Sequence, residues 1–237
     1  MKRKRLPCLM LAILLTLLMC AAHAEENFFN QTVFVGDSIL RSVGIYQAKR
    51  LKEGESLLNG AQFLAADGYK LSTGSRKQSN PNHINLIQNG KPVTPAEGIL
   101  NLEVKRAFVM LGLNDKAGYY LEKNLRNYER MITRILEANP GLDLIVLSVT
   151  PVVKIGQSKL IRQSYIDQFN HGLQALCEKK GVDFWDVSSA LKDAEGYLNP
   201  DYSYDQWIHL NNQGIQALIA ALDEKAGERG ALQEGTE

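Results

Sequence analysis

Short apolar runs alternate along this chain with longer segments in which apolar side chains return every three or four residues. The short runs have the β-branched and aromatic character of buried strands, and the longer segments have the period of amphipathic helices. The clearest helical pattern covers residues 121–136 and stops before Pro140. Five runs are interpreted as strands: 33–35, 62–66, 107–111, 144–149 and 182–187.

Strands that alternate with helices predict an α/β fold, in which helices cover both faces of a parallel sheet. Five such strands most often take the order 2-1-3-4-5. This order reverses direction between strands 1 and 3 and opens a crevice at their carboxyl ends, where ligands bind in sheets of this kind. We therefore expect a functional site at the ends of those two strands.

The segment 69–104 is an expected insertion between the second and third strands, rich in Ser, Asn, Gly and Pro. Asn89-Gly90 lies between two short apolar runs and predicts a hairpin, because a type I′ turn needs positive φ at both central residues. Residues 94–97, Thr-Pro-Ala-Glu, have the spacing of a capping box with proline at the first helical position. A short helix through Leu102 is therefore expected.

Residues 1–24 have the three parts of a secretory signal peptide. Four basic residues are followed by an apolar run to Cys20 and by small residues that would allow cleavage near Ala24. The apolar run is too short for a stable membrane span. We therefore expect a secreted or periplasmic protein with a single domain over residues 25–237, in which residues 227–237 form a frayed tail.

Charge and cysteine content narrow the classes of partner and cofactor. Residues 1–24 hold four of the 27 Lys and Arg residues and none of the 26 Asp and Glu residues, which leaves a net charge of −3 on the rest. No nucleic-acid partner is indicated. Cys177 is the one cysteine beyond Ala24, so disulfides are not expected to hold the fold. No metal-site spacing or phosphate-binding loop is present, and we expect no metal and no cofactor.

Polar residues follow two of the predicted strands and precede the last helix. Ser38 closes the block Gly-Asp-Ser after the first strand, and Asn114 follows the third. A serine hydroxyl needs a base within hydrogen-bond reach to act as a nucleophile. His83 lies in the polar insertion and His171 lies within a helix, where a surface or packing role is the ordinary interpretation. His209, on a turn before the last helix, is the candidate base.

A third group must fix the tautomer of such a histidine. Asp205 precedes His209 by four residues, so a tight loop would bring its carboxylate to the ring Nδ1. Asp201 is the alternative, although a turn role after Pro200 would also explain it. We prefer Asp205 and leave Asp201 open.

The negative charge that develops on a carbonyl oxygen needs preorganised donors. The side-chain amide of Asn114 and the backbone N–H groups of Ser38 and Gly68 are the candidates, because Gly68 ends the second strand and allows close approach. Gly60 and Gly74 are alternatives to Gly68. Structural roles would also explain three residues near these blocks in the sequence. Asp37 and Asp115 would hold turns, and Trp207 would either line the site or pack against other residues.

These blocks, taken in order, resemble the SGNH hydrolases, also called the GDSL esterase/lipase family. The resemblance spans nearly the whole chain beyond residue 24 and implies a flavodoxin-like three-layer α/β/α sandwich. It also implies that Ser38 is the nucleophile and His209 the base, and that Ser38, Gly68 and Asn114 form the oxyanion hole. Ile39 replaces the leucine of the family name, a conservative change.

The last block departs from the family pattern Asp-x-x-His. Here Asp205 and His209 are separated by one residue more, and glutamine occupies position 206, where the acid would fall. Three outcomes are open. The loop bulges to restore the contact, the enzyme works as a Ser-His dyad, or the chain is no longer an efficient hydrolase.

The expected function is a secreted or periplasmic serine esterase that hydrolyses small acyl esters, above all acetyl groups on carbohydrate, through an acyl-enzyme intermediate. Short lipid or aryl esters are the next class of substrate. An O-acyltransferase that passes the acyl group to a glycan would use the same residues. A catalytically weak carbohydrate-binding or scaffold protein on the same fold is the alternative from another class.

Overall fold

The computed structural model describes residues 28–234, and the expected signal segment therefore lies outside the described residues. The main sheet has five parallel strands in the order β2-β1-β5-β6-β7. Numbered along the chain without the hairpin, this is the predicted order 2-1-3-4-5. The strands are β1 (Thr32–Gly36), β2 (Gln62–Ala65), β5 (Arg106–Met110), β6 (Asp143–Leu147) and β7 (Asp183–Trp185).

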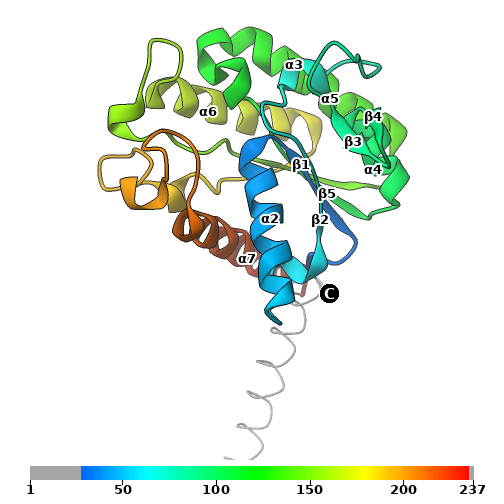
Figure 1. The fold of residues 1–237 in the computed structure, drawn as a ribbon. Helices are drawn as coiled ribbons and strands as arrows, with labels where there is room; N and C mark the ends of the chain where they lie inside the picture. Colours follow the sequence, from blue (N-terminus) through cyan, green and yellow to red (C-terminus); the bar gives the residue numbers. More distant parts are fainter. Residues whose placement is uncertain (1–27, 235–237) are drawn as a thin grey trace, which may run out of the picture.

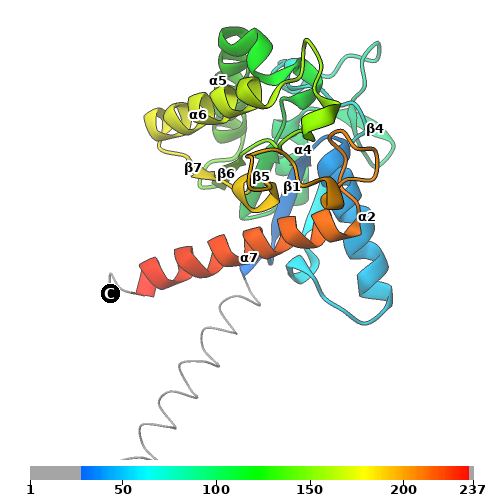
Figure 2. The ribbon, with the colours of Figure 1, turned by 90° about the vertical axis from the view of Figure 1, so that its left-hand side faces the viewer.

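Helices cover both faces of the sheet, which confirms the three-layer α/β/α prediction (Figures 1 and 2). Helices α2 and α7 lie on one face, and α4, α5 and α6 lie on the other (Figure 2). The α-helices of the described part are α2 (Ser38–Lys52), α3 (Leu71–Gly74), α4 (Pro95–Leu102), α5 (Leu121–Ala138), α6 (Gln163–Lys180) and α7 (Asn212–Glu234). None of them is long and apolar enough to cross a membrane.

The core includes a stack of aromatic rings on the face of the sheet that α2 covers. The rings of Phe34 in β1 and Phe108 in β5 are nearly parallel, with centroids 4.7 Å apart. Phe63 stacks on the other side of Phe34, and Trp185 meets Phe108 edge to face. Such aromatic pairs add to the stabilisation that comes from burying their area. Phe34 pairs in register with Phe63 of β2 and with Phe108 of β5, so the rings connect three neighbouring strands.

Gly36 allows β1 and β5 to end side by side. It pairs with Met110, and a Cβ atom at position 36 would lie 2.9 Å from the Met110 carbonyl oxygen and 2.6 Å from Leu40 Cδ1. A larger residue would force the strand end and the start of α2 apart. The chain therefore passes directly from the strand into the helix that begins at Ser38.

Helix α2 continues through Gly44, although a glycine inside a helix lowers its intrinsic stability. A Cβ atom at Gly44 would lie 2.8 Å from Phe63 Cγ, so glycine here gives close packing between α2 and β2. Tertiary packing thus overrides the weak local propensity.

The insertion between β2 and β5 is ordered by the two predicted signals. The strands β3 (Leu86–Gln88) and β4 (Lys91–Val93) form an antiparallel hairpin, and φ is positive at both Asn89 and Gly90. At the start of α4, Glu97 N–H donates to the Thr94 hydroxyl at 3.3 Å, and Thr94 N–H donates to Glu97 Oε2 at 2.8 Å. The hairpin and capping-box predictions are confirmed.

A frayed tail was expected from residue 227, and in the part of the chain that the structure describes α7 continues to Glu234. Arg229 explains the difference. Its guanidinium pairs with Asp143 at 2.9 Å and with Asp183 at 3.0 Å, at the starts of β6 and β7. These ion pairs hold α7 against the sheet at Arg229, inside the segment that was expected to fray.

Candidate functional site

Ser38 is the first residue of α2, at the carboxyl end of β1. The preceding residue, Asp37, is the N-cap of the helix and accepts a hydrogen bond from Ile39 N–H at 3.1 Å. An aspartate at this position satisfies one of the free N–H groups at the start of the helix. The cap fixes the first turn of α2 and holds the half-buried Ser38 at the rim of the sheet.

His209 reaches Ser38 from the opposite end of the sequence. Its Nε2 lies 3.2 Å from Ser38 Oγ, across a sequence separation of 171 residues. Its Nδ1 lies 2.6 Å from Asp205 Oδ2. The three side chains therefore form one continuous line of contacts, and a hydroxyl, an imidazole and a carboxylate in this arrangement suit nucleophilic attack.

Asp205 is held by its own loop as well as by the imidazole. Its Oδ1 accepts hydrogen bonds from Trp207 N–H at 2.9 Å, from the Ser203 hydroxyl at 2.9 Å and from His209 N–H at 3.2 Å. Partial burial raises the pKa of Asp205, but the hydrogen bonds from His209 and Ser203 outweigh burial, and the net pKa lies below its usual value. The carboxylate is therefore ionised at neutral pH.

The extra residue in this loop is accommodated by a local bulge. Gln206 has a φ of 55°, in the left-handed region that non-glycine residues seldom adopt. The bulge returns the chain so that both Trp207 and His209 face the Asp205 carboxylate. Of the three outcomes that the spacing left open, the geometry is that of the restored contact.

The competing residues are not at this place. Asp201 is exposed, and its hydrogen bonds run through its backbone, with N–H to Asn199 Oδ1 and the carbonyl to Asn211 Nδ2. His83 is exposed in the insertion, and His171 is exposed on α6. The structure therefore brings Asp205 and His209 to Ser38 and leaves the alternatives outside.

Asn114 contacts both the end of β1, at Asp37, and the loop after β2, at Tyr69. Its Nδ2 donates to Asp37 Oδ2 at 3.2 Å and to the Tyr69 carbonyl at 3.2 Å. The next residue, Asp115, accepts hydrogen bonds from the N–H groups that open α3, at 2.6 Å from Leu71 N and 3.0 Å from Ser72 N. Two consecutive residues after β5 thus tie the end of β1 to the loop after β2.

Gly68 immediately precedes Tyr69 in this tied loop. Its φ is +69°, and a Cβ atom would lie 3.0 Å from Ile84 Cδ1. Gly74 is buried inside α3 against Met131, and Gly60 belongs to a 3-10 helix before β2. Gly68 is therefore the glycine that the loop carries next to the Asn114 contact.

Asp37 is a buried acid beside Ser38. Only 3% of its surface is exposed, and burial raises its pKa to about 6, although the hydrogen bond from Ile39 N–H and the charge of His209 act in the opposite direction. It contacts Asn114 and the backbone of α2. Its contacts are those of a residue that positions its neighbours, as the sequence indicated.

The comparison with protein families identifies the chain. Residues 34–217 match the model of the GDSL-like Lipase/Acylhydrolase family, which covers most of the chain. The chain belongs to this family. It is therefore a serine hydrolase that acts on ester bonds. No curated protein matches the sequence significantly.

Solved structures share the fold of this GDSL family member at low sequence identity. A GDSL-like lipase from Bacteroides thetaiotaomicron has a TM-score of 0.60 and 18% identity over 84% of this chain and 88% of its own. A lipase/acylhydrolase from Enterococcus faecalis has a TM-score of 0.57 and 14% identity over 84% of this chain and 96% of its own. A carbohydrate esterase family 3 protein from Talaromyces cellulolyticus has a TM-score of 0.54 and 17% identity over 82% of this chain and 95% of its own.

Two contacts of this GDSL hydrolase were not anticipated from the sequence. Ser203 is buried and orients Asp205, and Tyr204 stacks on the His209 ring with centroids 5.7 Å apart at 15°. The one sequence signal was the Tyr- and Asp-rich composition of residues 201–205. The ring of Trp207 approaches His209 edge on, and a Cβ at Gly156 would lie 2.8 Å from Trp207 Cα, so Trp207 both faces the site and packs.

Proposed function

We propose that Ser38 is the nucleophile of a Ser-His-Asp triad that hydrolyses small acyl esters. The main support for this proposal is a pair of contacts. Ser38 Oγ lies 3.2 Å from His209 Nε2, and His209 Nδ1 lies 2.6 Å from Asp205 Oδ2. His209 takes the Ser38 proton as Oγ attacks the ester carbonyl carbon, and then gives that proton to the departing alcohol oxygen. Water, deprotonated by His209, releases the acid from the acyl-enzyme and restores the serine hydroxyl.

The oxyanion that forms in both steps is held by the Ser38 and Gly68 N–H groups and by the Asn114 amide. Ser38 N–H lies in the first turn of α2, where helix N–H groups are free and the helix dipole favours negative charge. Both resting contacts of Asn114 Nδ2 are long, at 3.2 Å, so one of its hydrogens can turn to the new acceptor. Each donor of this kind contributes roughly 3–4 kcal/mol to the transition state.

The substrate class is a small acyl group, above all acetyl, esterified to a carbohydrate, and the place of action is the periplasm or the cell exterior. The N-terminal segment with its basic start and short apolar run supports export. The same fold is used by a carbohydrate esterase and by an acetyl esterase whose structure holds acetate, which supports the ester class. No step in this proposal uses a metal or a cofactor.

The decisive experiment combines p-nitrophenyl acetate with a serine-directed organophosphonate. The purified protein should hydrolyse the ester and take up one phosphonate on Ser38, and both properties should be lost in Ser38→Ala. Mass spectrometry of the labelled peptide identifies the serine. Glycan binding without labelling or hydrolysis would instead support a scaffold protein and would overturn the proposed function.

A further inference from the structure

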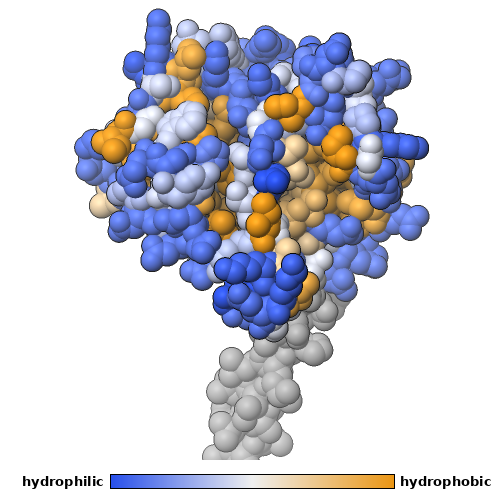
Figure 3. All heavy atoms as spheres, viewed as in Figure 1, coloured by the Kyte–Doolittle hydropathy of each residue, from blue (hydrophilic) through white to orange (hydrophobic). Residues whose placement is uncertain are grey.

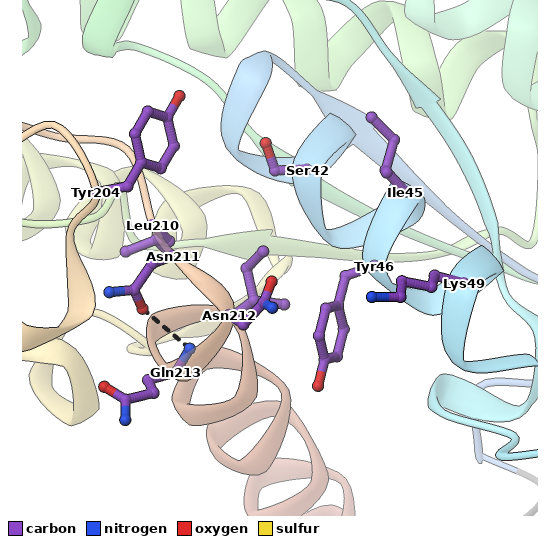
Figure 4. A pocket seen from close by; sticks show the side chains of 10 residues that line it. Ser42, Ile45, Tyr46, Lys49, Tyr204, Leu210, Asn211, Asn212 and Gln213 are labelled. Atoms are coloured by element: carbon purple, nitrogen blue, oxygen red, sulfur yellow. Dashed lines mark hydrogen bonds between the residues drawn. The ribbon is translucent and has the colours of Figure 1, made fainter. Parts of the chain in front are cut away.

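An open groove of about 540 Å³ lies between helix α2 and the chain that enters α7 (Figure 4). This volume is within the usual range of small-molecule sites, about 300–1,000 Å³. One wall comes from α2 and the other from the loop and first turn of α7 (Figure 4). The lining residues are Ser42, Ile45, Tyr46, Lys49, Tyr204, Leu210, Asn211, Asn212, Gln213 and Ile215.

The groove runs along the face of α2 that also carries Ser38. Ser42 is four residues after Ser38, so the two lie on one face of α2 a single turn apart. Lys49 lies eleven residues after Ser38, about 16 Å along the helix axis. At the other wall, Tyr204 lines the groove and stacks on the His209 ring. The α2–α7 groove therefore leads away from the site on the side of the imidazole.

This direction decides which half of an ester the groove can receive. The imidazole must protonate the departing alcohol oxygen, so the alcohol half of the substrate lies on the His209 side. The carbonyl oxygen must face the opposite segments, which carry Gly68 and Asn114. Neither of these residues, nor their neighbours in the chain, lines the groove. The groove is therefore on the alcohol side of the reaction.

The polar side chains of the groove have free hydrogen-bonding capacity. Within the described part of the chain, Ser42, Lys49, Asn212 and Gln213 make no side-chain hydrogen bond or ion pair, and all but the half-buried Ser42 are exposed. Asn211 differs, because its amide caps α7 and binds the Asp201 carbonyl. Ligand hydroxyls can replace the solvent at these four groups and hydrogen-bond with them.

The apolar surface of the groove is limited and partly aromatic. Tyr204 is 66% exposed, and Ile45 is 55% exposed on the α2 wall. Figure 3 shows that hydrophobic atoms gather mainly on the other side of α2, over β2 and the hairpin. An acyl chain in the groove would strip water from an ammonium and two amides without replacing their hydrogen bonds, which is unfavourable. A sugar offers hydroxyls to these groups and C–H faces to the ring.

We propose that the α2–α7 groove binds the pyranose chain that carries the ester, with Ser42, Lys49, Asn212 and Gln213 contacting its hydroxyls. The proposal rests on the proposed function, since the groove is assigned to the alcohol half of the same reaction. It adds the location and the chemistry of the glycan subsite. The sugars next to the ester lie near Tyr204 and Ser42, and more distant sugars lie toward Lys49.

The kinetic test compares partially O-acetylated xylotetraose with p-nitrophenyl acetate, in which the alcohol half is too short to reach along the groove. Asn212→Ala and Lys49→Ala should each lower kcat/KM for the oligosaccharide, relative to p-nitrophenyl acetate, by about ten-fold, as expected for one lost hydrogen bond of about 1.4 kcal/mol. The loss should appear mainly in KM. Lys52→Ala, on the same helix outside the groove, is the matched control. Tyr204 is unsuitable for this test because it contacts His209.

A binding test separates this proposal from the proposed function, because it needs no turnover. Xylotetraose added to the Ser38→Ala protein should shift the NMR signals of the Asn212 and Gln213 side-chain amides, and Lys49→Ala should weaken that binding. Equal effects of the groove variants on both esters, or no shift of these amides, would overturn the groove proposal. Failure of the wild-type protein to hydrolyse p-nitrophenyl acetate, together with a clear amide shift, would overturn the triad proposal alone.

Discussion

The Asp205 carboxylate reaches His209 Nδ1 at 2.6 Å because Gln206, between them, has a left-handed backbone conformation. The longer spacing of this pair is therefore absorbed by one residue and does not displace the acid. The side chain of Gln206 also donates to the Pro200 carbonyl at 3.2 Å, which holds the bulge against the preceding turn. The left-handed conformation of Gln206 is therefore expected to matter for the contact of the acid with the imidazole.

We expect the Gln206→Gly and Gln206→Val variants to differ in both turnover and stability. Glycine adopts the left-handed region without steric cost, so turnover should be retained and stability should stay within about 1 kcal/mol of the wild type. A β-branched residue at positive φ is strained and should cost about 1–2 kcal/mol while moving Asp205 away from the ring. Thermal unfolding and p-nitrophenyl acetate kinetics measure both effects. Equal behaviour of the two variants would show that the bulge does not control the site.

Asp205→Asn should slow turnover strongly, and Asp201→Asn should not. The amide at 205 cannot stabilise the imidazolium or hold its tautomer, so kcat should fall by about 10²–10⁴-fold. Asp201 is a matched control on the same loop, because its hydrogen bonds involve only its backbone. Steady-state kinetics with circular dichroism as a check on folding would decide. A larger loss in Asp201→Asn would reverse the assignment of the acid.

Asp37→Asn should stabilise the fold above pH 6. Burial raises the pKa of Asp37 to about 6 from 3.8, so the folded state binds this proton more tightly than the unfolded state. The protonated form is thus favoured in the fold, and stability is lost as the pH rises from about 4 through 6. An uncharged asparagine avoids this loss and still caps α2, with a gain of up to about 3 kcal/mol at pH 7–8.

The measurement is the difference in unfolding free energy between wild type and Asp37→Asn from pH 3.5 to 8. It should be small near pH 3.5, increase between pH 4 and 6 and remain constant above that range. A difference that is independent of pH would mean that Asp37 does not titrate in this range. Other acids are common to both proteins, so their titration cancels in the difference.

Asn114→Ala should reduce kcat by about 10²–10³-fold with little change in KM, because the amide is used in the transition state and not in substrate binding. Asn101→Ala provides the control, since its amide binds only Gln88 on the surface. Steady-state kinetics with p-nitrophenyl acetate measure kcat and KM. If kcat changes less than threefold, the oxyanion is held without this amide.

The sequence predicted those features that depend on local chemistry or on a strong topological rule. Asn89-Gly90 required positive φ at both positions and has it, and the strand order followed from alternating strands and helices. The length of α7 could not be predicted in this way. It depends on Arg229 meeting Asp143 and Asp183, which are separated from it by 86 and 46 positions and gave no signal in the composition of the tail.

In the site, too, some residues could be predicted from the sequence and others could not. Ser38, His209 and Asp205 could be nominated because their chemistry restricts the choice of residue type and because few histidines compete. Ser203 and Tyr204 could not, because a serine and a tyrosine in a polar loop have no pattern that distinguishes them from solvated residues. Their roles follow from the path of the loop around Asp205, which includes the left-handed residue Gln206 and the bridge between Ser203 and Leu210.

Ser38 and His209 are separated by 171 positions and meet only through the tertiary structure. In an unfolded chain the hydroxyl at position 38 has no partner to remove its proton. Any activity that needs this contact therefore requires the folded chain, and its loss reports unfolding of the segments that hold the two residues together.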